Sequence, residues 1–294
     1  MMARAQIAQL ARRVGGVLAR VAATALVAGV LSATLVRFAP GFGVDERQLD
    51  SHLSAESQRA IVRAHDEERN PARFYVSYLR RMFAGNLGFS QSLGRPIQEL
   101  LAERAPETAD LMVSGIAGAW LLALAFAVPP VTWRWPTLDG FFSIFSGLSA
   151  CLPAAAVALL LYRLGASAKW MIPVILFPRI YQYLRNLLRQ SYGMPHVLLA
   201  RAKGLTGYRI FLQHVLPPAG GPLIALAAVS VNMAFGAAVA VEAICDLPGI
   251  GQLAWKAALA RDLPVLVILT TIVALMTQFS NLLADTFRPA RSQA

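Results

Sequence analysis

Residues 198–217 read LLARAKGLTGYRIFLQHVLP and form a polar window between long apolar runs. The pattern predicts a short helix over residues 197–203 that ends at Gly204, because glycine adopts a positive φ without strain. Thr206 is placed to cap a second short helix, and the proline pair at 217–218 is expected to end it. The segment therefore predicts a glycine elbow between short helices, held at a membrane surface.

The first predicted helix of this elbow combines small and cationic side chains. Ala200 and Ala202 let another surface approach closely, while Arg201 and Lys203 can pair with an acidic groove. One interpretation is therefore a docking element for another protein. The other is a basic loop beside the membrane that contacts only lipid head groups. The elbow by itself leaves both interpretations open.

The composition of the whole chain indicates a protein that crosses the membrane several times. Of its 294 residues, 56% are hydrophobic and only 15% are charged, whereas a soluble domain has about 25% charged residues. The mean hydropathy is +0.53. The formal net charge of +11 comes from short basic segments beside apolar runs. The preference for cytoplasmic lysine and arginine explains this pattern more simply than nucleic-acid binding does.

Six apolar runs predict an all-α, polytopic membrane protein with six transmembrane helices. They cover about residues 18–38, 108–128, 138–161, 169–184, 222–244 and 265–284. Arginines before the first run and after the last place both termini in the cytoplasm. The alternative for the first run is a cleaved signal peptide, but the run is long for one and lacks a clear small-residue cleavage site.

Prolines and small residues predict where these helices end, bend and pack. A short helix over residues 96–104 is expected before the second run. Asp110 lies in the first turn of the second run, and the proline pair at 129–130 ends it. Pro153 predicts a kink in the third run. Close helix packing is expected at the small residues in and just before the fifth run: Gly220, Gly221, Gly236, Ala237 and Ala238.

The charge pattern divides the chain into three regions. Residues 1–38 form a cytoplasmic N-terminus and the first transmembrane helix. Residues 39–105 contain nine acidic and nine arginine side chains, which makes this segment too polar to span the membrane and places it outside. Residues 106–294 form the core with five transmembrane helices. Within the core, residues 185–218 carry cations and no acid, as a cytoplasmic loop does.

Glu242 stands out as an acid near the outer end of the fifth run. A charge at the bilayer centre costs about 2.5–3.5 kcal/mol, while each leucine contributes only about 0.3–0.6 kcal/mol. The long run before Glu242 and its place near the end make the charge tolerable. An acid within a membrane segment is nevertheless a functional candidate.

The elbow resembles the cytoplasmic "EAA" loop of importer-type ABC transporter permeases at Ala202, Gly204, His214 and Pro217. The run ARAKGL at 200–205 is most similar to the dipeptide, oligopeptide and nickel branch of that family. Further matches are DLPGIG at 246–251, RDLP at 261–264 and the segments 53–56, 85–90 and 104–108. The family usually has Asp where Asn86 stands, and its external connection between the third and fourth spans is longer.

The resemblance implies two sets of site residues. The ATPase-coupling loop consists of Ala200, Arg201, Ala202, Lys203, Gly204, Leu205, His214 and Pro217. The external re-entrant loop contains Glu242, Pro248, Gly249, Gly251, Arg261 and Asp262. In this comparison Glu242 takes a structural place beside the loop that follows it.

The resemblance also implies the fold and function of a type I ABC importer permease. The chain would be the transmembrane subunit of an ATP-driven importer in the bacterial inner membrane, carrying peptides or a related small solute by alternating access. Its expected partners are a second permease, two ABC ATPases, an external solute-binding protein and membrane lipid, with no nucleic acid. We expect no cofactor on this chain and ATP use by the partners, because the sequence has no phosphate-binding loop.

Two alternatives belong to other classes. A non-transporting membrane scaffold or assembly subunit derived from such a permease would fit the shortened connection between the third and fourth spans. A membrane-embedded protease would need an intramembrane serine with a histidine partner, and Ser114 has no histidine within a predicted span. The four histidines and two cysteines lack metal-ligand spacing, so an enzyme is not expected.

Overall fold

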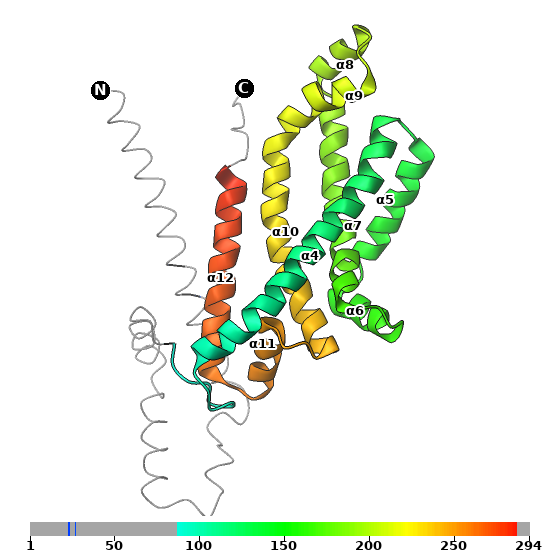
Figure 1. Ribbon diagram of the computed structural model, residues 1–294. Coiled ribbons are helices and arrows are strands. Elements are labelled where there is room, and N and C mark those ends of the chain that lie inside the picture. Colours follow the sequence, from blue (N-terminus) through cyan, green and yellow to red (C-terminus); the bar gives the residue numbers. More distant parts are fainter. Residues whose placement is uncertain (1–22, 24–26, 28–86, 287–294) are drawn as a thin grey trace, which may run out of the picture. The chain divides into compact units, whose positions relative to one another are not determined.

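The computed structural model describes residues 87–286, together with Ala23 and Val27. Residues 87–286 are helical apart from turns and an isolated bridge between Phe89 and Pro96. The helices are α4 (Ile97–Thr132), α5 (Pro136–Ala150), α6 (Ala154–Arg163), α7 (Ala168–Tyr192), α8 (Pro195–Ala202), α9 (Gly207–Ile210), the π-helix η2 (Phe211–Val215), α10 (Leu216–Cys245), α11 (Ile250–Leu259) and α12 (Leu263–Thr286) (Figure 1).

The chain forms two compact units. Unit 1 contains the chain up to Glu103 and Leu253–Gln278, and unit 2 contains Arg104–Gln252 and the chain from Phe279 onward. Most of α4, all of α5 to α10 and the start of α11 belong to unit 2.

Three helical segments among the described residues are long and apolar enough to cross a membrane: Ile97–Thr132, Gly207–Cys245 and Leu263–Thr286. The bent pair α5–α6 makes a fourth if it is counted as one span. The predicted first span, at 18–38, lies outside the described residues, and the cation-rich α7 is not among the apolar segments. An all-helical membrane protein is therefore confirmed for the described residues, while the full set of six spans stays a prediction.

α4 is one helix of 36 residues, whereas the sequence predicted a short helix over 96–104 and a separate span over 108–128. Pro106 and the proline pair at 129–130 lie inside it. Each proline removes one backbone hydrogen bond, which helices in apolar surroundings tolerate when nearby groups compensate. The helix ends instead near Arg134, whose φ of 56° reverses the chain.

The continuity of α4 also changes the place of Asp110. The sequence predicted this acid in the first turn of a helix, stabilised by the helix dipole. In the structure it lies well inside α4, and its carboxylate pairs with Lys169 Nζ at 2.9 Å. The exposed ion pair links α4 to the first turn of α7.

The predicted third span, over 138–161, is broken at Pro153. The sequence suggested only a kink there, but α5 and α6 meet at an angle of 99°. Pro153 is extended, with φ −61° and ψ 138°, and it has no N–H to continue the hydrogen bonding of α5. Its ring also disfavours the helical conformation at Leu152. The helix therefore stops and restarts in a new direction.

α7 continues beyond the predicted end at residue 184 to Tyr192. Pro173 and Pro178 lie inside it, and both are buried. Consequently Arg185 and Arg189, which the sequence placed in the inner loop, belong to the last two turns of α7. Cations are favourable at this end because the helix dipole is negative there.

Glycines permit the closest helix packing in unit 2. A Cβ at Gly118 in α4 would lie only 2.9 Å from Pro173 Cγ in α7, and Gly115 is packed still more tightly. Small residues of this kind let membrane helices approach closely. The same close packing was predicted for the small residues of α10: Ala237 and Ala238 are buried there, but a Cβ at Gly220 or Gly236 would meet no atom within 4 Å. That part of the prediction was wrong, because helix periodicity does not show which face meets a neighbour.

Candidate functional site

The glycine elbow lies between α8 and α9, at one end of α7 and α10 (Figure 1). Gly204 has φ 77°. Its N–H donates to the Arg201 carbonyl at 2.9 Å, and the Leu205 N–H donates to the Ala200 carbonyl at 3.3 Å. These two bonds form a Schellman motif, which closes the C-terminus of α8. Thr206 stands at the N-cap position of α9, but its side chain makes no capping hydrogen bond.

The proline pair at 217–218 does not end the second helix, contrary to the prediction. The helical path runs on from Gly207 to Cys245 through η2. The wider π turn brings the prolines into the first turn of α10, where a missing N–H is tolerated. Pro218 leaves the His214 carbonyl without its usual donor, and His196 Nε2 lies 2.9 Å from that oxygen. His196 therefore replaces a backbone bond, a role that the sequence analysis missed.

The elbow has a packed interior and several large apolar side chains on its outer surface. Val197, Ile210 and Val215 are at most 3% exposed. Large apolar side chains on the outside are Leu198, Leu199, Tyr208 and Leu212, each at least 39% exposed. A groove of about 520 Å³ is lined by residues between Gly204 and Gln213. Apolar side chains around a groove are what a docking partner would cover.

The predicted coupling-loop residues are divided between this interior and surface. Ala200 is buried at 2% exposure and fixes α8 against its neighbours. Ala202, Lys203 and Pro217 are exposed. The Arg201 guanidinium lies over the Tyr192 ring, 5.4 Å from its centroid, which restrains this cation beside the elbow.

Glu242 is fully buried in the last turn of α10. Its Oε2 accepts hydrogen bonds from the backbone N–H of Gly251 at 2.7 Å and of Gln252 at 3.3 Å. Both donors belong to the first turn of α11, where the helix dipole favours an anion. Asp246, with φ 51°, turns the chain between the two helices. The carboxylate therefore closes the loop between α10 and α11.

The glycines of the DLPGIG turn make room for this carboxylate. A Cβ at Gly249 would overlap the Glu242 carboxylate. A Cβ at Gly251 would lie 2.5 Å from Val239 Cα and 3.0 Å from Glu242 Oε2. Neither glycine has a positive φ. Both positions exclude larger residues because of close contact and not because of backbone conformation. Pro248, which precedes Gly249 in this turn, is exposed.

Gln252 extends this network to α4 and was not predicted. It is 3% exposed. Its amide donates to Asp246 Oδ1 at 2.5 Å and accepts a hydrogen bond from Arg104 Nη1 at 2.9 Å. Thr108 Oγ1 accepts the Ile250 N–H at 2.8 Å. The partners are separated by more than 140 residues in the sequence, so no local pattern could have paired them.

In unit 1, Asp262 joins the start of α12 to the turn at residues 90–95. It is 1% exposed. Its Oδ2 accepts hydrogen bonds from Ser90 Oγ at 2.5 Å, Ser92 Oγ at 2.7 Å and Ser92 N–H at 2.9 Å. Arg261 beside it is exposed and has φ 56°. The two serines were missed, although Ser90 belongs to a segment that resembles the family's external region.

A buried acid in unit 2 was also missed. Asp139, in the first turn of α5, is 3% exposed. Arg185 donates to both of its oxygens, at 2.5 and 2.7 Å, and Arg189 donates to Oδ2. This cluster ties the start of α5 to the end of α7. Two of the cations that the sequence assigned to the basic inner loop are thus held at one carboxylate within the protein.

The enzyme alternatives can be compared with the geometry of the described residues. Within residues 87–286, no three His, Cys, Asp or Glu side chains are placed to hold a metal ion. The Ser114 hydroxyl, considered as a nucleophile, donates to the Asp110 carbonyl at 2.7 Å and so is part of its own helix.

Comparison with known proteins identifies the class. The family of binding-protein-dependent transport system inner membrane components matches residues 115–292, and the chain belongs to this family. It is similar to the oligopeptide transport system permease protein of Bacillus subtilis (strain 168), with 24% identity over 285 residues, 87% of this chain and 90% of that protein. It is also similar to the glutathione transport system permease protein of Salmonella choleraesuis (strain SC-B67), with 25% identity over 293 residues, 92% of this chain and 94% of that protein.

Proposed function

We propose that this chain is the transmembrane permease subunit of an ATP-driven ABC importer that carries peptides. Family membership supports the transport role, and relatives named as oligopeptide and glutathione permeases support peptides as the solute. The chain binds no cofactor and is not an enzyme in this proposal. Partner ATPases hydrolyse the ATP.

The elbow is the proposed ATPase docking site, and its exposed apolar surface is the observation that carries this assignment. Leu199 on α8 is 58% exposed, and Tyr208, which lines the groove, is 74% exposed. The Schellman motif at Gly204 and the buried Val197 hold these side chains on a rigid frame. A lipid-binding loop needs no such frame, whereas a docking element that transmits force does.

The elbow is also connected to the external loop by a continuous helical path. This path runs from Gly207 to Cys245, and Glu242 closes the loop at its far end. A displacement of the elbow by the ATPases would therefore move α10 as a body, which fits alternating access through rocking of packed helices.

The proposed layout has six spans, with both termini in the cytoplasm and residues 39–105 outside to receive a solute-binding protein. α7 is one of the spans, because its 25 residues reach about 37 Å at 1.5 Å per residue, and the apolar layer is about 30 Å thick. Asp139 neutralises Arg185 at its inner end. A second permease completes the pathway, and the complex has two ATPases.

The test uses the complete complex, in which this chain is co-expressed with its partner permease, ATPases and binding protein. We expect ATP-dependent peptide uptake in proteoliposomes. Leu199→Asp should reduce co-purification of the ATPases about tenfold or more, since a buried charge disrupts an apolar contact. Leu93→Asp, at a leucine that is 45% exposed outside the elbow, is the matched control and should leave co-purification unchanged.

Full recovery of the ATPases with Leu199→Asp would contradict docking at the elbow. An assembled complex that transports no peptide in the presence of ATP and binding protein would instead favour the scaffold alternative.

A further inference from the structure

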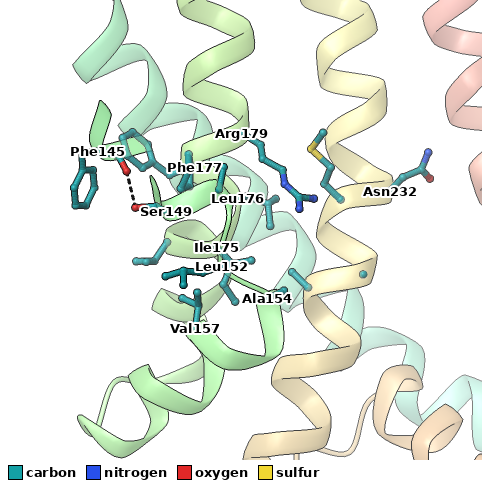
Figure 2. Close-up of a pocket in the computed structure, with 16 residues that line it drawn as sticks. Phe145, Ser149, Leu152, Ala154, Val157, Ile175, Leu176, Phe177, Arg179 and Asn232 are labelled. Carbon is teal, nitrogen blue, oxygen red and sulfur yellow. Dashed lines mark hydrogen bonds between the residues drawn. The ribbon is translucent and has the colours of Figure 1, made fainter. Parts of the chain in front are cut away.

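A cavity of about 410 Å³ lies among α5, α6, α7 and α10 in unit 2 (Figure 2). Its walls are mostly apolar, with Phe145, Leu152 and Val157 on one side and Phe177 on α7. The volume is within the range of about 300–1,000 Å³ that small-molecule sites occupy. Apolar walls with few polar groups are also typical of such sites.

Arg179 is the only cation that lines this cavity. It lies near the middle of α7, about 16 Å from the first residue of the helix. Its side chain extends from α7 toward α10 (Figure 2). The other polar lining groups are uncharged: Asn232, and Ser149, whose hydroxyl is 2.9 Å from the Phe145 carbonyl.

Arg179 has no acidic partner within residues 87–286. The contrast with Arg185, six positions further along α7, is informative, because that guanidinium is bound by both oxygens of Asp139. Arginine keeps its charge in apolar surroundings. In a membrane segment an unpaired charge is costly, and such residues face a water-filled cavity or mark a pathway for the solute.

We propose that this cavity is a subsite of the transport pathway, in which Arg179 binds the C-terminal carboxylate of a peptide. The planar guanidinium matches a carboxylate through two parallel hydrogen bonds. The apolar walls around Phe145 and Phe177 would receive the adjacent side chain of the peptide. This inference rests on the proposed function, since it assumes that peptides pass through this chain.

The test measures binding of labelled peptide to the purified complete complex in lipid nanodiscs without the binding protein. Each peptide is used with a free C-terminal carboxylate and as its C-terminal amide. The wild-type complex should bind the free carboxylate about 10- to 100-fold more tightly than the amide, as expected for hydrogen bonds to charged groups. Arg179→Leu should remove this preference by weakening only the carboxylate form, and Arg179→Lys should retain part of it.

The matched control is Arg163→Leu, at an exposed arginine in the last turn of α6 outside the cavity. It should keep the wild-type preference. If the wild type binds both forms equally, or Arg179→Leu keeps the preference, the subsite is overturned while peptide transport stands. If Arg179→Leu loses the second permease during purification, Arg179 pairs with that subunit and the proposal is also overturned. A wild-type complex that neither binds nor transports any peptide would contradict the proposed function itself.

Discussion

The elbow and the Glu242 loop both depend on glycine, but for different physical reasons. Gly204 has φ 77°, and a Cβ there would meet nothing within 4 Å. Gly251 has no positive φ, but a Cβ there would lie 2.5 Å from Val239 Cα. Gly204 sets a backbone conformation at an exposed position, and Gly251 permits close contact between α10 and α11 in a buried region. Substitutions can therefore separate a local conformational requirement from a packing requirement.

The largest effect is expected for Gly251→Ala. The new Cβ would collide with the α10 backbone and crowd the Glu242 carboxylate, and backbone atoms cannot rotate away. We expect a loss of about 3 kcal/mol in the free energy of unfolding, at the upper end for overpacking. Thermal unfolding of the solubilised protein measures this. Gly236→Ala in α10 is the control, since its Cβ has open space, and equal unfolding temperatures for both variants would refute the packing explanation.

An intermediate effect is expected for Gly204→Ala. The methyl group fits, but an L-residue in the left-handed region costs about 1–2 kcal/mol. The strain should loosen the C-terminus of α8 and lower peptide uptake per ATP hydrolysed, while the chain still inserts in the membrane. Gly207→Ala, three residues further on, has no positive φ and open space, so it is the control. Normal coupling in Gly204→Ala would show that the elbow geometry is not needed.

The smallest effect is expected for His196→Ala, which removes the donor to the His214 carbonyl. His196 is exposed, so water can partly replace it, and we expect a loss of about 0.5 kcal/mol. Amide hydrogen exchange in η2 should increase, because the π turn loses its side-chain support. His196→Gln keeps a side-chain donor and should restore part of the protection. Unchanged exchange in the alanine variant would show that η2 holds its shape without His196.

The features that could be predicted from the sequence depend on neighbours along the chain. The elbow at Gly204 was predicted correctly because a glycine after a short helical run is a local signal, and its Schellman bonds join residues at most five positions apart. The apolar runs likewise predicted helices. The ends of those helices were less predictable: the proline pairs at 129–130 and 217–218 were expected to stop helices and instead lie inside or at the start of them.

Other site residues could not be predicted because their partners are distant in the sequence. Nothing in the sequence indicated a partner for Asp139, and only the structure shows that it pairs with Arg185 and Arg189. Gln252 meets Arg104 across 148 positions, and Ser90 meets Asp262 across 172. The family resemblance marked Glu242 and Asp262 as site residues, but it did not show which groups donate hydrogen bonds to their carboxylate oxygens.

By itself, the sequence determined the class of protein, the helical runs and the glycine elbow. Hydrophobicity over about twenty residues and the φ preference of glycine are properties of the local chain. Only the tertiary structure decided where prolines are tolerated, which glycines make close contacts, and that Arg179 lines a cavity while Arg185 is paired. These outcomes depend on which helix faces meet, and packing between distant segments sets that.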